Sequence, residues 1–431
     1  MKKIAIKTLG CKVNTYESES IWQLFAKEGY TRVEPDQFAD VYVINTCTVT
    51  NSGDRKSRQA IRKVIRQNPE AVTVVIGCYA QMAPEDIEAI EGVDIVLGTQ
   101  GREKLVEYVR NFQNERAPIT NVENIIEQKQ FEGLEISGFE SQTRAFLKIQ
   151  EGCNNFCSFC IIPWARGLMR SQDPKLVISQ IETLVAKGVK EVVLTGIHTA
   201  GYGEDFEDYN FADLLRDIDQ IAGLERIRIS SIEISQITPE VLEVMRNSTK
   251  LADHLHVPIQ AGHNQILTDM RRHYTVEEFK AHVDKLRAIF PSISLTTDII
   301  VGFPGETDEM FAETIDNLRA IGFNELHVFP YSKRNGTPAA KMPNQVADDV
   351  KKARVHRLIE LNDELAIKYS QLFTGDIVDV LVERVNKNGL LEGHTSNYIK
   401  VQFNGSEKLI GSIVSVVIKD SNYPLNNGEI V

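Results

Sequence analysis

The sequence is short of long apolar runs, of positive charge and of cysteine, and each shortage excludes a class of protein. Nowhere in its 431 residues do apolar side chains approach the ~18–20 consecutive positions of a membrane-spanning helix. The N-terminal segment MKKIAIK alternates like a strand and lacks the apolar centre of a signal peptide. We therefore expect a cytoplasmic protein with reduced thiols and no membrane partner. The formal net charge is −12, so binding of a nucleic acid would depend on a local basic patch.

The six cysteines fall into two groups of three. Cys153, Cys157 and Cys160 have the spacing C-x3-C-x2-C, with no fourth cysteine nearby. Three thiolates can hold three irons of a [4Fe–4S] cube and leave the fourth iron open to a ligand other than the protein. A structural zinc site normally uses four ligands, and a ferredoxin-like motif would supply a fourth cysteine, so zinc and inert-cysteine interpretations explain the spacing less well.

With the aromatic Phe159 before its last cysteine, this motif resembles the signature of radical S-adenosylmethionine (SAM) enzymes. In that family the open iron chelates the amino and carboxylate groups of the methionine part of SAM. The resemblance therefore implies one [4Fe–4S] cluster on this motif and SAM as the cofactor bound to it.

The other three cysteines lie in residues 1–120, where strand and helix patterns alternate and predict an open parallel sheet flanked by helices. Strands are expected at residues 3–9, 40–45, 72–77 and 94–97, and helices at 16–27, 53–67 and 84–90. Cys11, Cys47 and Cys78 each follow one of these strands, where ligands of open parallel sheets gather. Three ordinary buried cysteines are the simpler explanation, but the positions at strand ends favour a second [4Fe–4S] cluster.

One predicted helix carries an arginine face. Arg55, Arg58, Arg62 and Arg66 recur at steps of three and four residues, so they line one side of that helix. The ordinary explanation is a solvated surface, but the face follows Cys47 closely in an acidic chain and is a candidate for contacting RNA phosphates. A second basic run suggests the same role more weakly and comprises Lys351, Lys352, Arg354, His356 and Arg357.

The central segment repeats strand and helix six times between residues 144 and 331, which suits a partial (β/α)6 barrel, the core that radical SAM enzymes share. The strands are expected near residues 145–149, 190–194, 226–230, 254–258, 292–300 and 325–330. Residues 111–143 are polar and weakly periodic and predict a linker with a possible strand. We assign the central domain to residues 140–368.

Polar and glycine residues follow several of these strands, where barrel chemistry is found. By resemblance, Thr195 and Gly196 stand where the family holds the methionine ammonium, and Gly302 and Gly305 stand near the adenine. The full set of candidate cofactor-binding residues is Phe159, Thr195, Gly196, Ser231, Glu233, Gln260, Asp298, Gly302 and Gly305. Each alone is more simply explained as turn chemistry. His198 and His256 are assigned no catalytic role, and no catalytic residue is identified.

Residues 370–431 change to short alternating strands with Asn-Gly turns, which predict a small β-barrel. Its five basic and seven acidic side chains do not favour binding of RNA. Tyr398, Phe403 and Tyr423 could still stack on unpaired bases. An acidic barrel could equally bind a basic ribosomal protein, so both kinds of substrate stay open.

The N-terminal phrases TLGCKVNTYES, NTCTVT and GCYAQ look like the first domain of the methylthiotransferases, which join such a domain to a radical SAM core and a TRAM-type barrel. Three branches of that family act on isopentenyladenosine in tRNA, on threonylcarbamoyladenosine in tRNA, or on an aspartate of a ribosomal protein. The phrase from Lys7 to Ser18 most resembles the threonylcarbamoyladenosine branch, which modifies position 37.

This resemblance implies a specific chemistry and specific partners. The cluster on the C-x3-C-x2-C motif would cleave SAM to a radical, the second cluster would carry or donate sulfur, and a second SAM would supply the methyl group. It also implies binding to the tRNA anticodon loop, a flavodoxin- or ferredoxin-like electron donor and a sulfur source. The alternative of another class is a non-catalytic iron–sulfur protein that binds RNA or transfers electrons.

Overall fold

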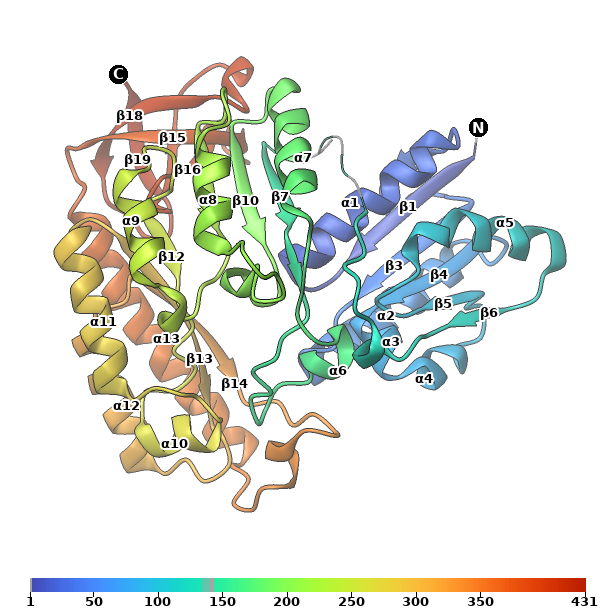
Figure 1. Ribbon diagram of the computed structural model, residues 1–431, viewed down its shortest axis with the longest axis horizontal. Coiled ribbons are helices and arrows are strands. Elements are labelled where there is room, and N and C mark those ends of the chain that lie inside the picture. Colours follow the sequence, from blue (N-terminus) through green and yellow to red (C-terminus); the bar gives the residue numbers. More distant parts are fainter. Residues whose placement is uncertain (1, 135, 137, 139–142) are drawn as a thin grey trace.

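The computed structural model describes residues 2–134, 136, 138 and 143–431, and its elements form three parts along the chain (Figure 1). The first part is a six-stranded parallel sheet in the order β2-β1-β3-β4-β5-β6. Its strands are β1 (Lys3–Thr8), β2 (Thr31–Val33), β3 (Val41–Thr46), β4 (Val72–Gly77), β5 (Ile95–Leu97) and β6 (Ile119–Asn121). Strands β3 and β4 are buried along their whole length, as expected for a sheet covered on both faces.

Helices cover both faces of this sheet and create two separate cores. They are α1 (Lys12–Lys27), α2 (Asn51–Gln67), α3 (Cys78–Met82), α4 (Pro84–Glu88) and α5 (Leu105–Glu115). Ile21 and Phe25 of α1 pack with Val109 of α5 on one face, and Ile61 and Val64 of α2 pack on the other. The expectation of an open parallel α/β domain is confirmed.

The predicted linker of residues 111–143 was partly wrong. Helix α5 extends to Glu115 because Leu105, Val109 and Phe112 recur at helical spacing and are buried against the sheet. The possible strand exists as β6, which pairs with β5 at the sheet edge. The remainder of that segment as far as residue 134 holds one short 3-10 turn at Ile125–Glu127.

The central part contains the six expected strands as two parallel rows, β11-β10-β7 and β12-β13-β14, joined by a bridge from Ile227 to Leu251. They are β7 (Arg144–Lys148), β10 (Glu191–Thr195), β11 (Arg226–Ile229), β12 (His254–His256), β13 (Ser294–Val301) and β14 (Glu325–Pro330). The outer helices are α7 (Pro174–Ala186), α8 (Phe211–Asp219), α9 (Pro239–Asn247), α11 (Val276–Ile289), α12 (Asp308–Ile321) and α13 (Asp348–Gln371). Within the described chain β7 and β14 do not pair, so the barrel is partial, as predicted.

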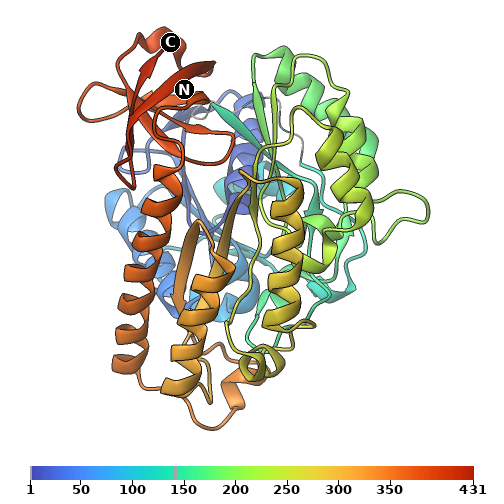
Figure 2. The ribbon, with the colours of Figure 1, turned by 90° about the vertical axis from the view of Figure 1, so that its left-hand side faces the viewer.

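The third part is a closed five-stranded barrel in the order β15-β16-β17-β19-β18. Its strands are β15 (Ile377–Val385), β16 (Leu391–Thr395), β17 (Lys400–Phe403), β18 (Ile413–Asp420) and β19 (Asn426–Ile430). Figure 2 shows this barrel at the end of α13, and it also contacts the central strands. Arg226 of β11 donates to the carbonyl oxygen of Asp379 at 3.1 Å, and Arg228 donates to that of Ser396 at 3.1 Å.

None of the helices in the described residues combines the length and the apolar composition that a membrane crossing would need.

Candidate active site

The three clustered cysteines lie on the loop between β8 (Gln150–Glu151) and the short helix α6 (Ile162–Arg166). Cys157 is buried, and Cys153 and Cys160 are half-buried. The amide of Cys160 donates to the carbonyl of Cys157 at 3.0 Å, which folds the second half of the motif into a turn. Gly152 has φ 73°, and a side chain there would lie 2.0 Å from the carbonyl oxygen of Leu168, so the loop requires glycine at this position.

These thiols fit the donor set of an open [4Fe–4S] cluster. Burial raises the pKa of Cys153 to about 11 and that of Cys160 to about 12, so their thiolates need a cation to form. The guanidinium of Arg272 lies 3.5 Å from Sγ of Cys157 and adds a positive charge beside the thiols. Iron bound to the three sulfurs would supply the remaining charge and leave one iron free for another ligand.

The other three cysteines lie at the ends of three neighbouring strands. Cys11 follows β1, Cys47 follows β3, and Cys78 follows β4 as the first residue of α3. A Cβ atom on Gly10 would come within 3.2 Å of Sγ of Cys47, so the Cys11 loop passes directly against Cys47. Burial raises the pKa of Cys78 to about 12 and also raises that of Cys47, which again favours a bound cation over free thiolates.

Arg166 connects the two sets of cysteines. It ends α6, six residues after Cys160, and its side chain is fully buried. Its Nε donates to Sγ of Cys78 at 3.0 Å, and its Nη2 donates to Oδ1 of Asn14 at 2.8 Å. Its Nη1 donates to Oε1 of Glu151 at 2.7 Å, two residues before Cys153.

A buried network of six ion-paired charges surrounds this contact. Arg102 and Lys148 join Arg166 as cations, and the carboxylates are Glu17, Glu132 and Glu151. Burial alone would raise the pKa of Glu151, but Lys148 and Arg166 outweigh it and lower the pKa to about 2. The network joins the N-terminal part to the central part through paired charges and not through apolar contact alone.

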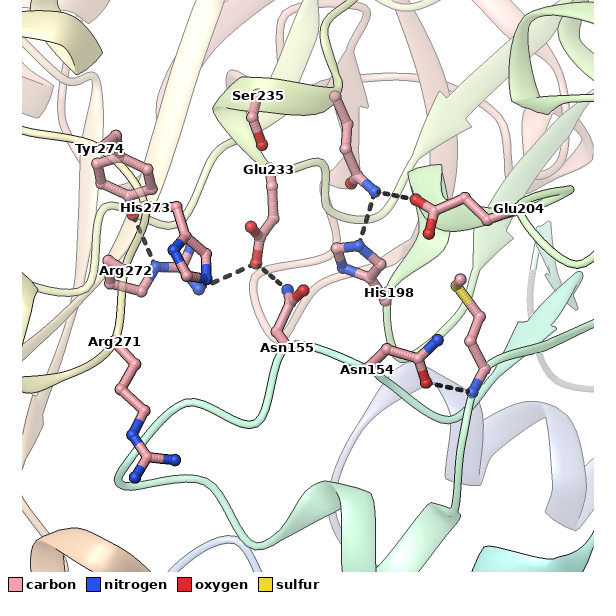
Figure 3. Close-up of a pocket in the computed structure, with 12 residues that line it drawn as sticks. Asn154, Asn155, His198, Glu204, Glu233, Ser235, Arg271, Arg272, His273 and Tyr274 are labelled. Atoms are coloured by element: carbon pink, nitrogen blue, oxygen red, sulfur yellow. Dashed lines mark hydrogen bonds and ion pairs between the residues drawn. The ribbon is translucent and has the colours of Figure 1, made fainter.

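A pocket of about 190 Å³ lies beside the clustered cysteines (Figure 3). Glu233, a predicted cofactor-binding residue, accepts hydrogen bonds there from Asn155 at 2.9 Å and from Arg272 at 3.0 Å. Arg272 also donates to the hydroxyl of Tyr274 at 3.0 Å, so its guanidinium is fixed between the cluster loop and Glu233. In Figure 3 the side chain of the neighbouring Arg271 points away from Glu233.

Other predicted cofactor residues are placed around the same end of the barrel. Thr195 is buried at the end of β10, and a Cβ on the following Gly196 would come within 2.9 Å of Oε1 of Gln150. Gln150 itself accepts from the amide of His198 at 2.7 Å and was not predicted. Ser231 and Phe159 are half-buried after β11 and on the cluster loop.

The residues predicted near the adenine follow β13. Gly302 and Gly305 have φ values of 71° and 85°, and the amide of Gly302 donates to Oε1 of Glu306 at 2.9 Å. Gln260 has φ 68° and is joined to β13 by backbone hydrogen bonds to Asp298 and Ile300. The structure thus brings most of the predicted residues to one end of the barrel, and their contacts with a cofactor stay a prediction. Asp298 differs, because it lies within β13, where its Oδ1 is 3.3 Å from Nε2 of His256.

The arginine face of α2 lies mostly in solvent. Arg55, Arg62 and Arg66 are exposed, whereas Arg58 donates to the hydroxyl of Tyr79 at 2.8 Å and is half-buried. The weaker suggestion for the second basic run was wrong for Arg354, which is buried and paired with Glu306 and Asp308.

Comparison with family models divides the chain into three matching regions. Residues 3–98 match uncharacterized protein family UPF0004, residues 147–318 match the radical SAM superfamily, and residues 371–427 match the TRAM domain.

Relatives match along the whole chain. It is 56% identical over 436 residues to the threonylcarbamoyladenosine tRNA methylthiotransferase MtaB of Bacillus subtilis (strain 168), covering 100% of this chain and 97% of the relative. It is 39% identical to the protein of that name from Aquifex aeolicus (strain VF5), covering 96% of this chain and 100% of the relative. A tRNA-2-methylthio-N(6)-dimethylallyladenosine synthase of Clostridium perfringens (strain SM101 / Type A) is 37% identical, with coverage of 100% and 98%.

Among solved structures, the radical S-adenosylmethionine methyltransferase TsrM from Kitasatospora setae, with cobalamin and a [4Fe-4S] cluster bound, has a similar fold. The TM-score is 0.60 at 16% identity, over 79% of this chain and 77% of that one.

Proposed function

This chain belongs to the radical SAM family of tRNA methylthiotransferases, and from that premise we propose that its substrate nucleotide is N6-threonylcarbamoyladenosine at position 37 of tRNA. The product is the 2-methylthio derivative. The observation that carries this proposal is the 56% identity over the whole chain to a relative named for that nucleotide. Relatives named for N6-dimethylallyladenosine share 37% and 38%.

Membership of the radical SAM superfamily implies a [4Fe–4S] cluster and SAM. We assign that cluster to Cys153, Cys157 and Cys160, and a second to Cys11, Cys47 and Cys78. When bound, these groups supply reductive cleavage of SAM, a sulfur atom and a methyl group. Such chemistry suits the target, because carbon 2 of adenine is aromatic and does not respond to ordinary acid–base catalysis.

The residues of the chain bind, orient and shield the cofactors and the substrate. Glu233 is held in place by Asn155 and Arg272, so its carboxylate is ready to accept from an ammonium or a ribose hydroxyl. Arg166 fixes the loop before Cys153 relative to Cys78. We assign SAM contacts to the predicted set, comprising Phe159, Thr195, Gly196, Ser231, Glu233, Gln260, Asp298, Gly302 and Gly305.

The partners follow from the same assignment. A tRNA substrate is common to the relatives, and we place the anticodon loop at the arginine face of α2 and the C-terminal barrel. The reaction also requires an electron donor of the flavodoxin or ferredoxin type and a source of sulfur. We place this protein in the cytoplasm.

Mass spectrometry of tRNA nucleosides tests the proposal. A strain that lacks this protein is expected to lose 2-methylthio-N6-threonylcarbamoyladenosine and accumulate the unthiolated nucleotide, and the purified protein with SAM, reductant and sulfide is expected to restore it. A product on dimethylallyladenosine alone, or on a ribosomal-protein aspartate with tRNA untouched, would contradict the substrate. Two clusters without any SAM cleavage would instead indicate an electron-transfer or RNA-binding protein.

A further inference from the structure

Arg272 stands between a thiol of the cluster loop and a carboxylate that we assign to SAM binding (Figure 3). Its Nη1 lies 3.5 Å from Sγ of Cys157 and 3.0 Å from Oε1 of Glu233. The side chain is only 5% exposed, so little water screens these two contacts. Since the guanidinium of arginine stays protonated in proteins, one permanent charge acts on a proposed cluster ligand and on Glu233 at the same time.

The turn that ends α10 (Asn264–Asp269) directs Arg272 inward. The amide of Arg271 donates to the carbonyl of Thr268 at 2.9 Å, and that of Arg272 donates to the carbonyl of Leu267 at 2.9 Å. These are the two hydrogen bonds of a Schellman motif, which requires a left-handed residue that is usually glycine. Arg271 takes that position with φ 60°, and its side chain is exposed. Of two neighbouring arginines, the motif thus leaves one in solvent and turns the other toward the cluster loop.

The cluster loop is fastened to the same turn. The amide of Ser158, the residue after Cys157, donates to the carbonyl of Met270 at 3.1 Å. The hydroxyl of Ser158 donates to the carbonyl of Asp269 at 2.6 Å. The backbone that carries Cys157 and the backbone that carries Arg272 are therefore held together, so the contact between the two side chains does not depend on a freely rotating arginine.

An ion pair that serves stability alone explains only part of this arrangement. In the part of the chain that the structure describes, Nη2 of Arg272 is buried without a hydrogen-bond partner. A buried charged donor without a partner costs stability, so this N–H group needs an acceptor from outside the protein. A [4Fe–4S] cluster beside Cys157 is such an acceptor, because three thiolates give the oxidised cluster a net negative charge and reduction makes it more negative.

We propose that Arg272 is a positioning residue that raises the reduction potential of the cluster on Cys153, Cys157 and Cys160 and holds Glu233 in place for SAM. This inference rests on the cluster and SAM assignments of the proposed function. In the step concerned, the cluster accepts one electron from a flavodoxin- or ferredoxin-like donor, and no bond forms or breaks. A cation and an N–H···S bond stabilise the added negative charge, whereas the carboxylate of Glu233 opposes it.

Reduction potentials of the variants R272Q, R272K, E233Q and R272Q/E233Q test the effect of these charges. They would be measured by EPR-monitored redox titration in the variant C11A/C47A/C78A, where only this cluster remains. R271Q is the matched control, because it removes the same charge from the neighbouring exposed position. An iron content of about four shows that a variant retains its cluster, and the affinity of the oxidised protein for SAM would be measured in parallel.

R272Q is expected to lower the ratio of reduced to oxidised cluster about tenfold at a given potential, which is a shift of about 59 mV to more negative potential. R272K keeps the charge and should shift the potential less, and R271Q should shift it by less than half as much as R272Q. E233Q should shift it in the positive direction, and R272Q/E233Q should lie between the two single variants. SAM affinity should fall about fivefold or more in R272Q and in E233Q, but not in R271Q.

Equal shifts in R272Q and R271Q, a negative shift in E233Q, or unchanged SAM affinity in R272Q would overturn the inference. If R272Q fails to hold iron, R272K and E233Q decide, because opposite shifts in these two support the inference and shifts of the same sign overturn it. If C11A/C47A/C78A itself binds no cluster, the proposed function fails. If that variant binds a cluster and cleaves SAM while R272Q keeps its potential, only this inference fails.

Discussion

Arg166 and Cys78 are joined by a hydrogen bond of 3.0 Å from Nε to Sγ, although they lie 88 positions apart and belong to different parts of the fold. The same guanidinium binds Glu151 at 2.7 Å, next to the loop that carries Cys153. One buried side chain therefore touches a ligand of one proposed cluster and the strand that leads to the other. Small relative movements of the two parts would break these contacts, so Arg166 fixes the spacing between the two sites.

Replacing Arg166 should affect both stability and the proposed second cluster. R166Q leaves Glu17 and Glu151 short of a counter-charge, which costs about 3–5 kcal/mol for a buried pair, so the melting temperature of the apoprotein should fall. The double variant R166Q/E17Q removes one charge of each sign, so its melting temperature should fall less than that of R166Q. Loss of the N–H···S bond and of a positive charge should make the reduction potential of that cluster more negative.

The reduction potential of the second cluster is best measured by an EPR-monitored redox titration in the variant C153A/C157A/C160A, where only that cluster remains. R166K keeps the charge without the planar donor geometry. Its reduction potential should lie between those of wild type and R166Q. An unchanged potential in R166Q would leave Arg166 with a purely structural role.

Measurements of iron content should distinguish the two sets of cysteines. Wild-type protein is expected to hold about eight irons after anaerobic reconstitution, and each triple alanine variant about four. C153A/C157A/C160A should lose SAM cleavage, whereas C11A/C47A/C78A should keep SAM cleavage and lose methylthio transfer. A full complement of iron in either variant would show that the ligands have been wrongly assigned.

The sequence was sufficient to predict the positions of these cysteines, because strand ends depend on local patterns. Residues 41–44 and 74–76 are apolar runs within strands that are buried along their whole length, and such strands in a parallel sheet end where its ligands gather. The six central strands were predicted for the same reason. The barrel strands β16 and β19 contain His394, Asn426 and Asn427 and lack clear alternation, so their positions could not be predicted from the pattern.

Contacts between distant segments could not be predicted in this way. Arg166 has no local partner that signals its role, and it meets Cys78 only because α6 packs against α3. Arg272 reaches Cys157 from beyond α10 (Asn264–Asp269), 115 positions away, and nothing in its neighbouring sequence indicates a cluster. Arg58 was predicted on the right face of α2, but its bond to Tyr79 depends on α3 and could not be predicted from the helix alone.

The exposed arginines of α2 are predicted to bind tRNA phosphates. R62Q/R66Q should weaken tRNA binding and reduce the slope of log K against log[salt] by about 2, since each lost contact releases about one counterion fewer. K280Q on α11 is the control, because Lys280 is exposed on the outer side of the central part and pairs with Asp284. Iron content and SAM cleavage without tRNA should be unchanged. A slope equal to that of wild type would make this face an ordinary solvated surface.

Glu191 should give the fold a specific dependence on pH. This buried residue of β10 lies 3.1 Å from Arg228 and 3.3 Å from Arg226, whose side chains also bind carbonyls of the C-terminal barrel. Burial would raise the pKa of Glu191, but Arg228 and Arg144 outweigh it and lower the pKa to about 2. Because an unfolded glutamate titrates near about 4.3, the stabilisation is complete above that pH and is lost as the pH falls toward 2.

E191Q should therefore destabilise the protein at neutral pH by about 3 kcal/mol, because the buried Arg226 and Arg228 and the half-buried Arg144 lose their shared carboxylate. The gap in melting temperature between wild type and E191Q should stay constant from pH 8 to pH 5 and should narrow below about pH 4.3, as the wild-type carboxylate is protonated. E225Q is the matched control, since Glu225 pairs with Lys190 on the surface and should contribute less than about 1 kcal/mol. A gap that widens on acidification, or an equal effect of E225Q, would show that Glu191 does not stabilise the contact between the central strands and the C-terminal barrel.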